Sequence, residues 1–154
     1  MRIGEPAPDF ELPDSGGRSI RLSALRGSPV VLVFYPRDET PGCTRQHCDL
    51  RDSWELFQAA GARVLGISPD TVESHAAFKE RHGLPHTLLA DPDHVAIDRY
   101  QVWGTVRLAD TERSAVVRST FLIGADGTLV EQWRDVSPET HAGEVLARLK
   151  ELAG

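Results

Sequence analysis

The sequence predicts an α/β fold: a central mixed β-sheet flanked by helices on both faces, with an N-terminal β-hairpin. The first observation behind this is that apolar runs of strand length alternate with segments whose apolar residues recur at helical spacing. The second is that a glycine-containing turn joins the last two strands, which favours an antiparallel pair at the end of the chain. No repeat, low-complexity tract or linker interrupts the 154 residues. We therefore expect one domain spanning residues 1–154.

The first half of the chain is typical of a hairpin followed by a βαβ unit. The apolar run at 30–35 has the length of a buried strand, and Pro36 ends it. In the helix expected next, one face carries apolar or weakly polar residues at spacings of 4, 3, 4 and 3, and Gly61 ends it. That face consists of Cys43, His47, Leu50, Trp54 and Phe57. The expected elements are strands at 10–12, 20–22, 30–35 and 63–68 and a helix over 41–61.

The second half predicts a further αβ unit and a ββα ending. Gly83 closes a helix, and the turn at 124–127 joins two strands. Ser137-Pro138 is typical of a helix start, and Val145, Leu149 and Leu152 fall on one face of the helix that follows. The expected elements are helices at 71–82, at 92–100 and after 138, and strands at 87–90, 119–123 and 128–133.

Composition excludes several classes of protein. Hydrophobic residues make up 40% of the chain and charged residues 26%, values of a globular protein rather than a disordered or membrane protein. Residues 1–10 lack the apolar core of a signal peptide, and no apolar run approaches membrane-spanning length, so we expect a cytoplasmic protein. The net charge of −6 argues against binding to nucleic acid or anionic membranes. Two cysteines are too few for a disulfide scaffold and fit a catalytic pair in a reducing compartment.

The strongest local signal is a cysteine at the start of a helix. Thr40 is a good N-cap and Pro41 suits the first helical position, which places Cys43 third in the helix. Free backbone N–H groups and the positive end of the helix dipole favour an anion there. A thiolate meets that demand, so Cys43 is predicted to be a nucleophile rather than a small buried apolar residue.

The motif around this cysteine resembles that of the peroxiredoxins, and in particular the peroxiredoxin Q type, also called bacterioferritin comigratory protein. Pro36, Thr40 and Cys43 match the family pattern Pro-x-x-x-Thr-x-x-Cys, and Cys48 matches the second cysteine of the Q type. Residues 118–123 resemble the strand that carries the family's arginine, and Trp103-Gly104 fits the loop before it. The N-terminal stretch also matches, through Gly4, Ala7, Pro8, Asp9, Phe10 and Leu12. The resemblance implies a thioredoxin-like fold.

The resemblance also implies a thiol-dependent peroxidase that reduces hydrogen peroxide and organic hydroperoxides. In this reading Cys43 attacks the peroxide and Cys48 resolves the product as an intramolecular disulfide, which thioredoxin or glutaredoxin then reduces. Thr40 and Arg118 hold the peroxide oxygens, and Pro36 shields the sulfur. No metal, flavin or nucleotide cofactor is implied, and a monomer is expected. One departure is Gln46, which stands where the family usually has a glutamate paired with arginine.

Other functions compete with this one. A thioredoxin-like disulfide reductase or isomerase is expected to carry a Cys-x-x-Cys motif, which the chain lacks. A non-enzymatic peroxide sensor or holdase is an alternative that the sequence does not exclude. Zinc would need further convergent ligands beside Cys43, His47 and Cys48, so no metal site is predicted, and His47 is expected to be a partly buried residue of the helix face. Phe34, Tyr35 and Trp103 are expected to pack in the core, although each could line a pocket.

Helix geometry constrains the two cysteines. Five residues of regular helix separate their Cα atoms by roughly 8.6 Å, beyond the reach of a disulfide. A structural disulfide is therefore excluded, and a catalytic one requires the first turns of the helix to unwind. We expect this opening to be easy, because Thr44, Arg45 and Gln46 are predicted to bury little apolar surface.

Overall fold

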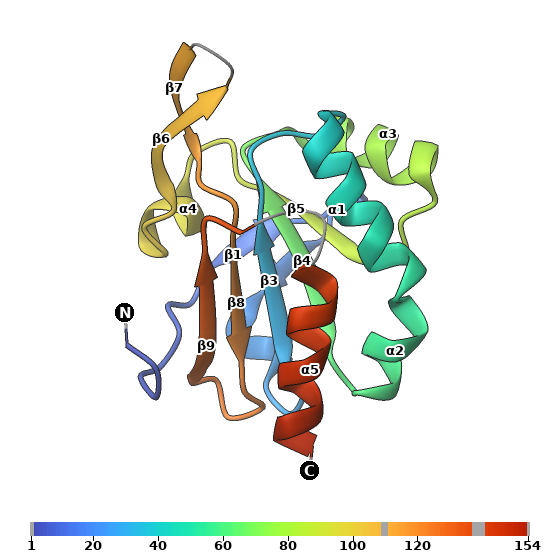
Figure 1. The fold of residues 1–154 in the computed structure, drawn as a ribbon, viewed down its shortest axis with the longest axis vertical. Helices are drawn as coiled ribbons and strands as arrows, with labels where there is room; N and C mark the ends of the chain where they lie inside the picture. The colour runs from blue at the N-terminus through green and yellow to red at the C-terminus, as the bar shows by residue number, and fades with distance from the viewer. Residues whose placement is uncertain (1, 109–110, 137–140, 154) are drawn as a thin grey trace.

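The computed structural model describes residues 2–108, 111–136 and 141–153, which are arranged around a five-stranded sheet with the strand order β5-β4-β3-β8-β9 (Figure 1). Strands β3, β4 and β5 are parallel, whereas β8 and β9 pair antiparallel on the other side of β3. The predicted mixed sheet is thus confirmed. Its strands are β3 (Val30–Phe34), β4 (Arg63–Ser68), β5 (Thr87–Ala90), β8 (Ser119–Ile123) and β9 (Leu129–Arg134).

Helices cover both faces of this sheet, as expected. They are α1 (Pro41–Asp52), α2 (Trp54–Ala59), α3 (Val72–His82), α4 (Val95–Arg99) and α5 (His141–Ala153). On one face, Val31 and Val33 of β3 pack with residues of α1, α2 and α5, and α5 crosses in front of the sheet in Figure 1. On the other face, Leu32 packs with Phe10 and with Ile97 of α4. This second face also holds the expected N-terminal hairpin, β1 (Glu11–Pro13) with β2 (Ser19–Arg21), and the short 3-10 helix Leu22–Leu25.

Three helical expectations were wrong in part. The helix expected over 41–61 is divided at Ser53, whose ψ of 10° takes the backbone out of the helical range. The helix expected at 92–100 begins only at Val95, because His94 has a φ of 57° and lies in the left-handed region. In α5, Val145 and Leu149 are buried as predicted, but Leu152 is 42% exposed. The expected cap Ser137-Pro138 lies outside the described residues.

A β-hairpin stands apart from the central sheet where the sequence predicted only a loop. Strand β6 (Trp103–Leu108) pairs antiparallel with β7 (Thr111–Val116), and the two project beyond the sheet at the top of Figure 1. The first four residues of β7 are exposed and polar, so no alternation of apolar residues marked this strand. Trp103 is 45% exposed, which overturns its predicted place in the core, whereas Phe34 and Tyr35 are fully buried.

None of the helices in the described part of the chain combines the length and the apolar character needed to cross a bilayer.

Candidate active site

Strand β3 brings the chain to the site, and its register fixes what lies beside it. Every residue of β3 is buried. Phe34, the last of them, is paired with Ile67 of β4 on one side and with Ser119 of β8 on the other. Because β8 runs antiparallel to β3, Arg118, the residue before β8, lies at the end of β3, where the chain turns toward α1. The sheet therefore joins two segments that are far apart in the sequence.

Helix α1 begins as predicted, although Thr40 does not cap it with its side chain. Thr40 is at the N-cap, Pro41 is the first helical residue, and the first helical bond runs from Thr44 N–H to the Thr40 carbonyl at 2.8 Å. The Thr40 hydroxyl instead donates to the carbonyl of Arg37 at 2.9 Å. Among the described residues, nothing accepts a hydrogen bond from the N–H groups of Gly42 and Cys43. These donors remain available to a ligand.

A guanidinium group contacts the cysteine sulfur. Cys43 is fully buried, and Nη2 of Arg118 lies 3.2 Å from its Sγ. Nη1 of the same side chain donates to Oε1 of Gln46 at 2.5 Å. The Gln46 amide thus offers Arg118 the same kind of acceptor as a glutamate would. It holds the guanidinium in place without adding a negative charge near the sulfur. The Arg118 cation, held against the sulfur, would stabilise a negative charge that develops there.

The second cysteine lies on the same helix and is not bonded to the first. Cys48 is half-buried, and both thiols are free. The structure therefore places Cys43, Thr40 and Arg118 together, while Cys48 follows five residues later along α1.

Neighbours of the buried Cys43 line a cleft of about 560 Å³, although Cys43 itself is not part of its wall. Gly42 and Arg118, which flank Cys43 on two sides, are part of its wall, as are Pro36 and Thr40. The β6–β7 hairpin forms another side of the cleft, a contribution that sequence reasoning missed because this hairpin carries no clear strand signal. From the hairpin come Trp103, Arg113, Ser114, Ala115 and Val116.

His47 is enclosed rather than partly buried. Its Nδ1 lies 2.8 Å from Nε2 of His86, and neither side chain is exposed. Burial lowers the pKa of His47 well below its ordinary value and that of His86 to about 3, so both rings are neutral. A role for His47 as a catalytic base is therefore not supported.

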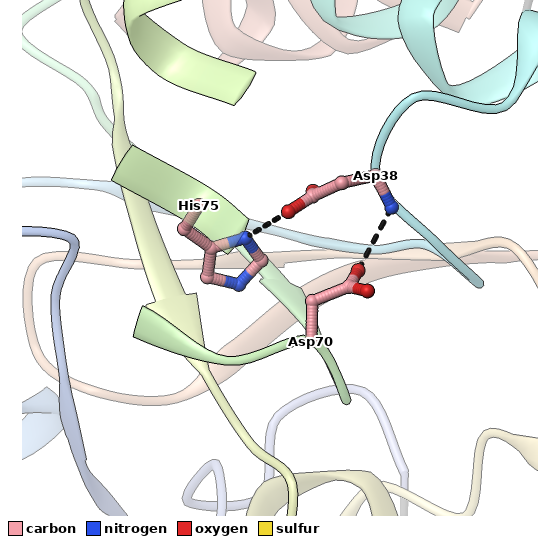
Figure 2. Close-up of side chains that lie close together, drawn as sticks. All are labelled: Asp38, Asp70 and His75. Carbon is pink, nitrogen blue, oxygen red and sulfur yellow. Dashed lines mark hydrogen bonds and ion pairs between the residues drawn. The ribbon is translucent and has the colours of Figure 1, made fainter. Parts of the chain in front are cut away.

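Three potential metal-ligating groups converge elsewhere in the described part of the chain, at Asp38, Asp70 and His75 (Figure 2). Their oxygen and nitrogen atoms are engaged in hydrogen bonds with one another and with neighbouring side chains. Sequence analysis did not single out these residues, because they come from three separate segments that only folding brings together.

Comparisons with known proteins agree on one family. Residues 3–132 match the model of the AhpC/TSA family. The chain is 42% identical to peroxiredoxin Bcp of Bacillus subtilis over 153 residues, which cover 99% of this chain and 98% of that protein. It is 43% identical to the chloroplastic peroxiredoxin Q of Oryza sativa subsp. japonica, covering 97% of this chain and 67% of that one. A solved structure of the Xanthomonas campestris bacterioferritin comigratory protein, studied for alkyl peroxide reduction, is 34% identical, with a TM-score of 0.90 and coverage of 99% and 100%.

Proposed function

Because the chain belongs to the AhpC/TSA family and, within it, to the peroxiredoxin Q or Bcp type, we propose that it is a thiol peroxidase reducing hydrogen peroxide and organic hydroperoxides. The observation that carries this proposal is the contact of Arg118 with the sulfur of Cys43 at the start of α1. A cation, free N–H groups and a threonine hydroxyl around one sulfur suit the attack of a thiolate on a peroxide bond.

The first step follows from the donors and acceptors around Cys43. The thiolate attacks the hydroperoxide oxygen that carries hydrogen, and an S–O bond forms while the O–O bond breaks. The electron pair of the O–O bond leaves with the second oxygen, which takes a proton from solvent and departs as water or alcohol. Cys43 is left as a sulfenic acid.

Thr40 and Arg118 would orient the two peroxide oxygens. The hydrogen of the Thr40 hydroxyl is donated to the Arg37 carbonyl, so the Thr40 oxygen offers lone pairs to the peroxide O–H. Arg118 and the N–H groups of Gly42 and Cys43 would donate to the oxygen on which negative charge develops. Pro36 adds an apolar wall that restricts water near the sulfur.

Cys48 would then resolve the sulfenic acid. Its thiolate attacks the sulfur of oxidised Cys43, hydroxide leaves, and an intramolecular disulfide forms. This step requires α1 to open, and the opening must break more contacts than the sequence suggested. Gln46 is only 3% exposed and His47 is fully buried, so the expectation that this turn buries little was wrong for Gln46. Opening would release Gln46 from Arg118 and His47 from His86.

An external dithiol would return the enzyme to its reduced state by thiol–disulfide exchange, and we propose thioredoxin or glutaredoxin for this role. We further propose that residues 1–154 act as one domain and as a monomer in the cytoplasm. The two free cysteines support the cytoplasmic assignment, since a reducing compartment keeps a catalytic pair reduced between turnovers.

Two cysteine variants test the proposed reaction. Cys43→Ser should lose peroxide consumption in an assay coupled to thioredoxin or glutaredoxin, because its hydroxyl yields no accessible anion near neutral pH. Cys48→Ser should react with one equivalent of peroxide and stall, and mass spectrometry should find added oxygen on Cys43. Turnover by Cys43→Ser, or an unmodified Cys43 in the second variant, would reject the assignment. A wild-type protein that reacts once with peroxide but is recycled by neither system would favour a sensor.

A further inference from the structure

The loop between β3 and α1 carries two proposed active-site residues, and a buried carboxylate lies between them. Pro36 and Thr40 line the cleft, whereas Asp38 is only 5% exposed. Charged side chains are seldom buried in a loop unless they have partners that fix them. The partners of Asp38 come from three other segments of the chain.

Asp38 is bound through both its side chain and its main chain. Its Oδ1 accepts a hydrogen bond from the Tyr35 hydroxyl at 2.6 Å, and its Oδ2 accepts one from Ser74 at 2.8 Å. The same Oδ2 lies 2.7 Å from Nδ1 of His75, as Figure 2 shows. The backbone N–H of Asp38 donates to Oδ2 of Asp70 at 2.8 Å. The centre of the loop is thereby connected to the end of β3, to the turn after β4 and to α3.

Both nitrogens of the His75 ring have hydrogen-bond partners. Nε2 lies 3.0 Å from the carbonyl of Leu89, which can only accept, so Nε2 carries a hydrogen. Nδ1 faces the Asp38 carboxyl, which already accepts from two hydroxyl groups. Asp38 and His75 thus form a buried hydrogen-bonded pair, and removing one partner would leave the other without its hydrogen bond.

The residue after Asp38 has a strained backbone. Glu39 has a φ of 65°, a region that residues other than glycine rarely adopt. Such a conformation persists only where the surroundings determine it. Asp38 fixes one side of this turn, and the Glu39 carboxylate contacts Arg81 and His82 of α3 at 3.1 Å each. Thr40 follows directly, and its hydroxyl is turned back to Arg37.

We propose that Asp38 and His75 are positioning residues for peroxide reduction. Their buried hydrogen-bonded contact holds the strained loop in the shape that places the Thr40 oxygen and the free N–H groups of α1 at the cleft. Neither residue contacts the peroxide; both act through Thr40. This inference rests on the proposed peroxidase function, and it adds a second layer of residues on which the reaction depends.

The test compares two reagents that attack the same sulfur. All variants carry Cys48→Ser, so that only Cys43 reacts. Hydrogen peroxide depends on the orientation by Thr40, whereas alkylation by iodoacetamide needs only the thiolate. In Asp38→Asn, the rate constant with peroxide should fall on the order of tenfold, since small misplacements of a positioned group are costly. The rate of alkylation should stay within about twofold, so the ratio of the two rates should fall.

Asp91→Asn is the matched control. Asp91 is also a buried aspartate after a strand, but its carboxylate accepts the N–H groups of Val95 and Ile97 at the start of α4. Both rates should be unchanged in this variant. If Asp38→Asn does not fold, Ser74→Ala replaces it in the same test, because this variant removes a single hydrogen-bond donor to Asp38. The ratio of the peroxide rate to the alkylation rate should then fall about threefold.

The outcomes separate the inference from the proposed function. A folded Asp38→Asn protein whose ratio of rates equals that of its parent would overturn the positioning role. An equal fall with both reagents would also overturn it, because that result means a general disturbance of the sulfur. If the parent with Cys48→Ser does not react with peroxide, the proposed function itself fails.

Discussion

Nδ1 of His47 lies 2.8 Å from Nε2 of His86, and together they join the second turn of α1 to the segment before β5. The two ring planes are nearly parallel, with centroids 5.1 Å apart and an interplanar angle of 12°. The ring centroids of Tyr35 and Phe78 lie 4.2 and 5.7 Å from that of His47. One ring donates an N–H to the other in this contact, and the outer nitrogens, His47 Nε2 and His86 Nδ1, have no partner among the described residues. The hydrogen bond is lost when both rings are protonated, because neither inner nitrogen could then accept.

Acid should loosen the beginning of α1. The pKa of His47 is lowered in the folded protein by burial first and then by His86, Arg118 and His75, while burial lowers that of His86 to about 3. In the opened segment the histidines take up protons below their ordinary pKa of about 6.5, whereas in the closed segment they do not. The free energy that keeps α1 closed therefore falls as the pH falls below that value. The loss is about 1.4 kcal/mol per pH unit for each histidine released. Amide hydrogen exchange at residues 43–49, corrected for its intrinsic pH dependence, measures the free energy of opening between pH 7 and 5.

The control for this pH effect is His47→Leu, which has no imidazole at the same place. Its opening free energy should lose most of the pH dependence attributed to His47, although His86 still titrates when exposed. Equal slopes in the two proteins would mean that α1 opens without releasing His47 from His86.

Disulfide formation should unwind the start of α1 and leave its end in place. In a regular helix the sulfurs of Cys43 and Cys48 point about 140° apart around the axis and cannot meet. Leu50 and Phe57 are buried against the sheet and should keep the rest docked. Hydrogen exchange should therefore rise at residues 42–49 in the disulfide form and stay low beyond Trp54. Indistinguishable exchange in the reduced and oxidised proteins would argue against Cys48 as the resolving residue.

Gln46→Glu should reduce the fraction of Cys43 that is thiolate near neutral pH. A carboxylate would draw Arg118 away from the sulfur and add negative charge close to it, and both changes oppose a second anion. Ultraviolet absorbance of the thiolate, titrated in proteins that also carry Cys48→Ser, compares the two side chains. An equal or larger thiolate fraction in the glutamate variant would show that this electrostatic reasoning is wrong.

Arg118→Lys should slow the reaction with peroxide by roughly a hundredfold, the effect typical of losing a donor to developing charge. A guanidinium reaches Gln46 and the Cys43 sulfur with separate N–H groups, whereas an ammonium lacks this fixed fork. Stopped-flow measurement of one turnover in the Cys48→Ser background gives the rate constant. Arg63→Lys, at the exposed first position of β4 and not part of the cleft wall, is the matched control and should react at the parent's rate. An Arg118→Lys protein within threefold of the parent would contradict the assigned role.

The sequence by itself determined those features that depend on neighbouring residues. Cys43 was placed correctly because an N-cap, a proline at the first helical position and a helical period are all local signals. The strands Arg63–Ser68, Thr87–Ala90 and Ser119–Ile123 were predicted residue for residue, since each is a short apolar run bounded by turn residues. The family motif added Arg118 and Cys48, which spacing alone would not have assigned.

Only the tertiary structure decided which distant groups meet. Arg118 reaches a sulfur 75 residues earlier in the chain because β8 pairs with β3 in one particular register. His47 meets His86, and Asp38 meets His75, across separations of 39 and 37 residues. Packing of α1 and α3 on the same sheet brings them together, and no local periodicity reports it. Local propensity thus places Cys43 at the start of its helix. The residues around it, Arg118, Asp38 and His86, reach their partners only through contacts between distant segments, which the folded sheet brings together.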